Sequence, residues 1–202
     1  MRRSAGEALG ADEIVVVSGL PRSGTSMMMK MLEAGGLVPL TDGQRAADED
    51  NLGGYYEYEG VKKVAQDPSW LDAARGRVVK VISRLLYDLP EGYAYRVVFM
   101  QRQLDEVLAS QQQMLQRRGR ADGGAGDAEL KQLFQRHLDE VALWLAARPN
   151  FAVLNLSYNE VLAQPGARVA DLVHFLGGQL DAARMAAVVD ERLYRQRTRP
   201  TS

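Results

Sequence analysis

Apolar positions along the chain follow two different patterns. Four short runs are almost continuously apolar and rich in β-branched residues, which is typical of strands that helices cover on both faces of a parallel sheet. These runs are 14–17, 78–82, 96–100 and 151–156. Between them, apolar residues recur every three or four positions, which predicts helices with one buried face. The helical segments are 25–34, 104–115, 128–147, 169–176 and 182–189.

Strands that alternate with helices predict an α/β fold in which helices pack on both sides of a parallel central sheet. Two stretches fall outside this alternation. Residues 37–58 are rich in Asp, Glu, Gly and Tyr, and residues 117–127 are rich in Gly, Arg and Asp. Long irregular segments often serve as lids or binding loops, and we expect 117–127 to be a mobile loop. We expect the whole chain, 1–202, to form a single domain with a flexible N-terminal segment, 1–12.

The composition is that of an ordinary globular protein and disfavours several classes of function. The 202 residues are 46% hydrophobic and 25% charged, and the net charge is −1. This balance disfavours binding to duplex nucleic acid, which requires a broad basic face. The absence of cysteine excludes disulfides, thiolate catalysis and cysteine-ligated metals. We find neither a signal-peptide pattern nor an apolar run of membrane-spanning length, and therefore expect a cytoplasmic protein without membrane contact.

The segment that follows the first apolar run has the pattern of a phosphate-binding loop. Four residues separate Gly19 from Gly24, and the hydroxyl pair Thr25 and Ser26 opens the next helix. The glycines permit a tight turn that points main-chain N–H groups inward, and the helix N-terminus adds further N–H groups and the positive end of its dipole. Arg22 adds a cation. The hydroxyl pair is expected to cap the helix or to donate to phosphate oxygens; a simple glycine turn before a capped helix is the alternative.

The loop departs from the pattern of nucleoside triphosphatases in two respects. That pattern has a lysine directly after the second glycine, where this chain has Thr25. It also has an acidic residue at the end of a later strand to organise magnesium, whereas the later strands here end near Ser83, Arg102 and Tyr158. We therefore expect a three-layer fold of the P-loop NTPase type that holds its ligand without a metal.

The loop sequence 20–26 resembles the 5′-phosphosulfate loop of the sulfotransferase family, in which arginine or lysine precedes Ser-Gly-Thr. A second family feature is an arginine at a strand end with a serine eight positions later, and Arg102 and Ser110 have this spacing. The last strand resembles the family strand whose tyrosine contacts adenine; Tyr158 stands there, although an ordinary packed aromatic fits this position equally well. The resemblance extends over about residues 14–197.

This resemblance implies the donor 3′-phosphoadenosine 5′-phosphosulfate (PAPS), which leaves adenosine 3′,5′-bisphosphate as product. The donor-binding residues that it implies are Pro21, Arg22, Ser23, Gly24, Thr25, Ser26, Arg102, Ser110 and Tyr158, with no metal ligand. It further implies an enzyme that transfers the sulfuryl group in line to a hydroxyl or amine of a small molecule, a glycan or a peptide. Arg22 would stabilise the leaving group, because such transfers depend on positioning and positive charge. Lys80 corresponds to the family lysine near the transferred group, and a solvated strand-end lysine is the alternative.

The general base is the least defined part of the site. Cytosolic relatives have a histidine just after the strand lysine, where this chain has Val81–Ser83. His137 and His174 fall on predicted helices, and packing or surface roles are expected for both. Other branches of the family use a glutamate after the first helix. We favour Glu57, because flanking tyrosines would desolvate its carboxylate; an acid at a helix start is an equally good interpretation.

Two other functions share these sequence features. A P-loop kinase would bind ATP with magnesium, and a non-catalytic relative would bind a nucleotide without turnover. The missing histidine leaves room for the second of these. The acceptor and the oligomeric state cannot be read from the sequence, because mobile loops and surfaces determine them.

Overall fold

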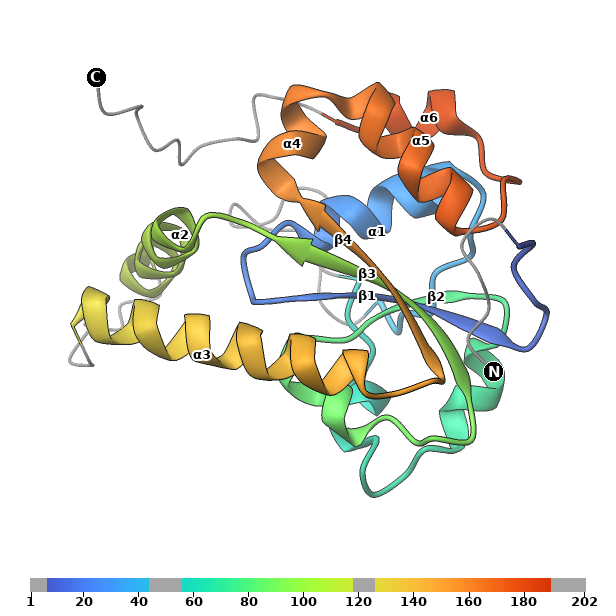
Figure 1. Cartoon of the computed structure of the whole chain (residues 1–202), viewed down its shortest axis with the longest axis horizontal. Coiled ribbons are helices and arrows are strands. Elements are labelled where there is room, and N and C mark those ends of the chain that lie inside the picture. The colour runs from blue at the N-terminus through green and yellow to red at the C-terminus, as the bar shows by residue number, and fades with distance from the viewer. Residues whose placement is uncertain (1–6, 44–55, 118–125, 190–202) are drawn as a thin grey trace.

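The computed structural model describes residues 7–43, 56–117 and 126–189. Within them, the strands β1 (Glu13–Gly19), β2 (Val78–Lys80), β3 (Ala94–Gln101) and β4 (Phe151–Ser157) form one parallel sheet in the order β2-β1-β3-β4 (Figure 1). Beyond β2, the main chain of residues 38–40 continues the sheet, since Leu40 N donates to Val78 O at 2.8 Å. Strand β1, which comes first along the chain, is therefore the second strand of the sheet and pairs with a neighbour on each side.

Helices cover both faces of the sheet, which gives the three layers expected from the sequence (Figure 1). The α-helices are α1 (Thr25–Ala34), α2 (Leu104–Arg117), α3 (Asp127–Ala146), α4 (Tyr158–Ala163), α5 (Pro165–Phe175) and α6 (Ala182–Ala187). Three short 3₁₀ helices in the described residues are η1 (Glu59–Lys63), η2 (Ser69–Ala74) and η3 (Ser83–Asp88). No helix in the described part of the chain is long and apolar enough to cross a membrane.

The side chains of β1 alternate between two hydrophobic cores. Val15 and Val17 pack with the methionines of α1 and with α4–α6, whereas Ile14 and Val16 pack with α3 and the 3₁₀ helices. Because both faces are covered, all seven residues of β1 are buried. This explains why the strand is a continuous apolar run and not an alternating one.

Arg96 of β3 anchors the start of the described chain inside this fold. Its side chain is 2% exposed and pairs with Glu13 at 3.0 Å. It also donates to the main-chain carbonyls of Glu7, Ala8 and Phe175 at 2.9, 3.2 and 2.7 Å. The buried guanidinium therefore has the partners that it requires, and it ties residues 7–8 to the end of α5.

The predicted fold class is confirmed, and all four predicted strands are present. Several boundaries differ from the prediction by one or more residues, and two of these differences have a clear physical reason. The strand predicted for 78–82 ends at Lys80, because its neighbour β1 turns away into the loop at Gly19. The helix predicted for 169–176 begins at Pro165, which occupies the first turn, where proline is favoured. The predicted mobile loop, 117–127, lies mostly outside the described residues, and so does 1–6 of the predicted flexible segment.

Candidate functional site

The loop between β1 and α1 turns sharply at its two glycines. Gly19 has φ +145° and Gly24 has φ +98°, and Arg22 between them also has a positive φ, of +74°. The turn is closed by Ser23 N, which donates to Leu20 O at 3.1 Å. A side chain at Gly24 would lie 2.3 Å from the ring of Tyr158, so glycine is required by space as well as by conformation.

The N-terminus of α1 presents groups that can bind an anion. Gly24 is the N-cap residue of this helix, and no side chain in the described part of the chain caps it. The predicted capping role of Thr25 and Ser26 is therefore wrong, because the helix already begins at Thr25. In addition, Ser23 Oγ is buried and has no hydrogen-bond partner among the described residues. Uncapped main-chain N–H groups and a buried hydroxyl at a helix N-terminus fit phosphate or sulfate oxygens.

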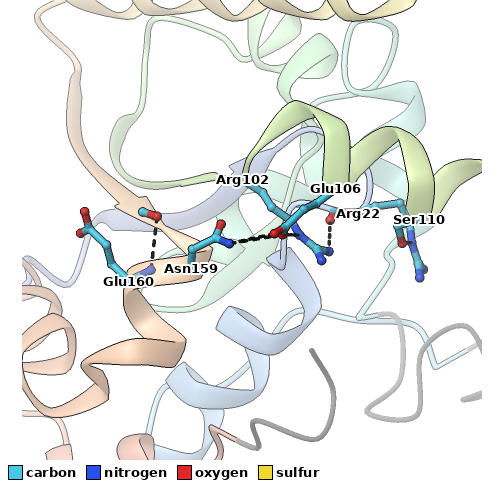
Figure 2. A network of polar contacts seen from close by, with 7 residues as sticks. Arg22, Arg102, Glu106, Ser110, Asn159 and Glu160 are labelled. Carbon is cyan, nitrogen blue, oxygen red and sulfur yellow. Dashed lines mark hydrogen bonds and ion pairs between the residues drawn. The ribbon is translucent and has the colours of Figure 1, made fainter. Parts of the chain in front are cut away.

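Helix α2 brings the second predicted anion-binding residue to this loop. Arg22 Nε donates to Ser110 Oγ at 2.9 Å, although 88 positions separate them in the chain. One residue further along α2, Gln111 Nε2 donates to Pro21 O at 3.3 Å. Figure 2 shows Ser110 on α2, facing the arginine of the loop. The two motifs singled out in the sequence thus form one site.

Arg102, which follows the end of β3, is held from three directions. Its Nε donates to Glu106 Oε2 at 2.9 Å, and a terminal nitrogen donates to Arg22 O at 3.1 Å (Figure 2). Its guanidinium carbon lies 4.5 Å from the centre of the Tyr158 ring. An arginine at the carboxyl end of a parallel strand faces the crevice where such sheets bind ligands. Arg102 is therefore fixed beside the loop before any ligand binds.

Glu106 is the buried counter-charge of this cluster, and the sequence interpretation missed its role. Its carboxylate is 1% exposed and lies between Arg102 and Asn159, whose Nδ2 donates to both oxygens at 3.2 and 3.3 Å. Figure 2 shows Asn159 reaching this carboxylate from α4. One signal was available: Glu106 stands four positions before Ser110, so the two share one face of α2, and Arg102 stands two residues before that helix begins. For Asn159 the sequence offered no such signal.

Tyr158 lies between the loop and Arg102, at the first position of α4. Its ring is 6% exposed, and burial raises the pKa of its hydroxyl, although Arg102 acts in the opposite direction. The prediction placed it at a strand end, and it directly follows β4. The ring thus lies next to both anion-binding segments. Its predicted contact with adenine stays a prediction.

The remaining predicted residues lie in two places. Lys80 ends β2, and its Nζ is 3.4 Å from Ser26 Oγ, so this lysine belongs to the loop site. Glu57 belongs to the segment after α1: its main-chain carbonyl accepts from Thr41 Oγ1 at 2.9 Å and from Asp42 N at 3.3 Å. These contacts tie Glu57 to residues 41–42. Its predicted role as the base stays a prediction.

A second polar pair lies at the end of β2. Ser83 Oγ is 2.9 Å from His137 Nε2, which reaches it from α3. A surface or packing role was expected for this histidine, because it falls on a predicted helix far from the loop in the sequence. Its pairing with Ser83, 54 positions away, could not be seen, since helical periodicity does not show which distant residue a polar side chain meets. The ring of Tyr87 also contacts it, edge to face, with 6.4 Å between ring centres.

The fold that carries this site is that of the sulfotransferases, a class with the P-loop type of three-layer sheet. Sulfotransferase STF1 from Mycobacterium tuberculosis superposes with a TM-score of 0.58 at 18% identity, over 89% of this chain and 72% of that one. The sulfotransferase domain of the Synechococcus PCC 7002 olefin synthase gives 0.53 at 15% identity, over 98% and 88%. Mouse SULT7A1, complexed with PAP, gives 0.50 at 16% identity, over 92% and 65%. Neither a protein-family model nor a curated protein sequence matches the chain. The resemblance predicted from the motifs is thus confirmed for the fold.

Proposed function

We propose that this protein is a PAPS-dependent sulfotransferase that transfers a sulfuryl group to a hydroxyl or amine. The observation that carries the proposal is the joining of the two anion-binding motifs. Arg22 donates to Ser110, and Arg102 donates to the carbonyl of Arg22, so that two arginines and a serine from distant segments lie together. A donor with phosphate groups at both its 3′ and 5′ positions requires two such anion sites at a short, fixed separation.

Different residues of the site would bind different parts of the donor. The uncapped N-terminus of α1 and Ser23 Oγ would hold the 5′-phosphosulfate, and Arg102 with Ser110 would hold the 3′-phosphate. Tyr158 lies between these two positions, where an adenosine would link them. PAP, which is adenosine 3′,5′-bisphosphate, is the ligand of the SULT7A1 structure, and its two phosphates match this division.

PAPS would supply an activated sulfuryl group, and the protein would supply position and charge. Arg22 and the loop N–H groups would stabilise the negative charge that develops on the phosphate as it leaves. Lys80 is placed beside the loop by its contact with Ser26 and adds positive charge on the side of β2. None of these roles requires a metal ion. Glu57 remains the base that the sequence predicts.

Binding of an ATP-type nucleotide with magnesium is the competing function. It needs a mobile lysine after the second glycine, but that position holds Thr25, whose side chain is buried at 9% exposure. A non-catalytic protein would share the donor site and lack turnover. A measurement of nucleotide binding therefore distinguishes the kinase from the other two functions. A measurement of PAPS turnover distinguishes the sulfotransferase from the non-catalytic protein.

Calorimetric titration with adenosine 3′,5′-bisphosphate and with ATP, each with and without magnesium, tests the donor site. We expect binding of the bisphosphate that does not depend on magnesium and that Arg102→Ala weakens about 100-fold, since a charge-assisted contact to a phosphate is lost. Arg75→Ala is the matched control, because Arg75 lies at the surface, where it pairs with Asp12 and Asp72 and stacks on the Tyr93 ring. Preference for ATP, or equal binding by Arg102→Ala and the control, would contradict the proposed donor.

A further inference from the structure

The pair formed by Ser83 and His137 involves the segment that leaves the carboxyl end of β2, next to the proposed donor site. Val81 N donates to Val17 O at 3.0 Å, two residues before the loop begins at Gly19. Ser83 follows Val81 by two residues, which is at most about 7 Å of extended chain. Lys80, on the same segment, already contacts Ser26 of the loop. The carboxyl ends of parallel strands are where such sheets bind ligands.

The imidazole of His137 is held in one orientation. Its Nε2 pairs with Ser83, whose side chain is buried at 2% exposure, and its ring edge meets Tyr87. The next turns of α3 fix the helix against the same 3₁₀ helix, since Trp144 packs on Tyr87 with 5.0 Å between ring centres. The other ring nitrogen, Nδ1, forms no hydrogen bond with the described part of the chain. The ring itself is partly exposed.

The surroundings of His137 favour its neutral form. Burial lowers its pKa below the usual value, and the nearby guanidinium of Arg84 lowers it further, whereas Glu140 opposes them. Tyr87 faces the same ring, and burial raises the pKa of its hydroxyl, so that it carries no charge near neutral pH. A histidine that is neutral at pH 7 can accept a proton from a reacting hydroxyl.

We propose that His137 is the catalytic base of the sulfuryl transfer, with Ser83 as its positioning residue. Ser83 Oγ accepts a hydrogen bond from the Nε2–H group, which leaves Nδ1 as the proton acceptor. Nδ1 takes the proton of the acceptor hydroxyl as its oxygen bonds to sulfur. The bond between sulfur and the bridging oxygen of PAPS breaks, and the bisphosphate leaves with that electron pair. This assignment rests on the proposed function and replaces Glu57 in the role of base.

Nitrogen-15 NMR of the histidine-labelled protein tests the arrangement without turnover. The sequence has two histidines, so His174→Gln assigns both sets of signals. We expect the Nε2–H tautomer for His137, with a pKa below 6.5, and a mixture of tautomers in Ser83→Ala. His174, exposed on α5, serves as the internal control. A dominant Nδ1–H tautomer in the wild-type protein would overturn the assignment.

Hydrolysis of PAPS by the protein tests the chemistry, because water then replaces the unidentified acceptor. We expect His137→Gln to lower the rate about 100-fold or more, with unchanged affinity for adenosine 3′,5′-bisphosphate. In the wild-type protein the rate should rise with pH through the pKa of His137 and then level off, since only the neutral imidazole accepts a proton. This acid limb should be absent in His137→Gln. His174→Gln is the matched control and should behave as wild type.

The outcomes separate this inference from the proposed function. Loss of bisphosphate binding in the wild-type protein would overturn both. Normal binding with full activity and an unchanged acid limb in His137→Gln would overturn the base alone. A parallel Glu57→Gln variant completes the comparison, because loss of the acid limb in that variant, and not in His137→Gln, would assign the proton to Glu57. A protein that binds the bisphosphate without any PAPS turnover would overturn the base and leave the donor site standing.

Discussion

Glu106 shows how a single buried carboxylate organises the donor site. A charged group at 1% exposure is tolerated only with full pairing, and here Arg102 and Asn159 provide it from two different elements. The carboxylate orients the guanidinium and leaves the ring face of Tyr158 against it. It also partly offsets the positive charge that Arg22 and Arg102 concentrate beside the loop. The donor site is thus preorganised at the level of individual side chains.

Replacing Glu106 by glutamine should separate this orienting role from phosphate binding. We expect Glu106→Gln to lower the free energy of unfolding by about 3 kcal/mol, since it removes one partner of a buried ion pair. Bisphosphate affinity should fall about 10-fold, less than in Arg102→Ala, because the guanidinium remains but loses its orientation. Urea unfolding and calorimetry measure the two effects. Glu160→Gln is the control: its ion pair with Arg168 is at the surface, and the change in unfolding free energy should stay below about 1 kcal/mol.

The loop glycine offers a second test at the scale of single residues. Gly24→Ala should reduce both stability and bisphosphate binding, because the new methyl group would meet the Tyr158 ring at 2.3 Å. Gly36→Ala is the control for backbone strain alone, since Gly36 has φ +107° and no atom of the described residues lies within 4 Å of the added atom. We expect a loss of about 1–2 kcal/mol for Gly36→Ala and a larger loss for Gly24→Ala in urea unfolding. Equal losses would show that contact with Tyr158 is unimportant.

At the scale of elements, the two ends of β3 have different roles: one supports ligand binding and the other supports packing of the fold. Its carboxyl end delivers Arg102 to the donor site, and its amino-terminal half carries Arg96 into the buried cluster with Glu13. Through its contact with Phe175 O, Arg96 also holds the end of α5. The strand therefore links the packing of the molecule to the geometry of the site. A change in Arg96 acts on fold stability, whereas a change in Arg102 acts on ligand affinity.

The fork geometry of Arg96 should be essential to this packing. Arg96→Lys keeps the charge but cannot reach Glu13 and three main-chain carbonyls at once, so carbonyls are left without their donors. We expect a loss of about 3 kcal/mol in the free energy of unfolding, measured with urea. Arg75→Lys, at the surface, should lose less than about 1 kcal/mol. If the two variants are equally stable, the buried cluster does not stabilise the fold.

At the scale of the whole molecule, the features that could be predicted from the sequence are those that depend on a local residue pattern, such as the strands and the phosphate loop. The runs 14–17 and 151–156 predicted strands because burial on both faces leaves a continuous apolar signature. The loop and the spacing of Arg102 and Ser110 predicted one crevice, because both stand at carboxyl strand ends. Strand order could not be predicted, since it depends on contacts between segments that are distant in the sequence. The pairing of His137 with Ser83 could not be predicted either, since it depends on how α3 packs against the residues after β2. No periodicity along α3 records that contact.

Ligand binding should stabilise the molecule as a unit, because the donor site draws on β1, β3 and β4 together with α1, α2 and α4. At a bisphosphate concentration 100 times its dissociation constant, the stabilisation should be about 2.7 kcal/mol. Thermal unfolding should therefore show a midpoint that rises with bisphosphate concentration and does not respond to magnesium. In Arg102→Ala the rise should require about 100-fold more ligand, and an unchanged dependence would argue against a shared site.

The central position of β1 has a consequence for how the protein is made. This strand leaves the ribosome before the other three strands of the sheet, yet it pairs with β2 and β3, which lie 59 to 88 residues later, and Arg96 meets Phe175 later still. Parallel pairing between distant segments forms slowly, and a run of β-branched residues without a partner invites contact with other chains. We expect Ile14–Val17 to be the segment that a nascent-chain chaperone protects during translation, until the rest of the sheet arrives.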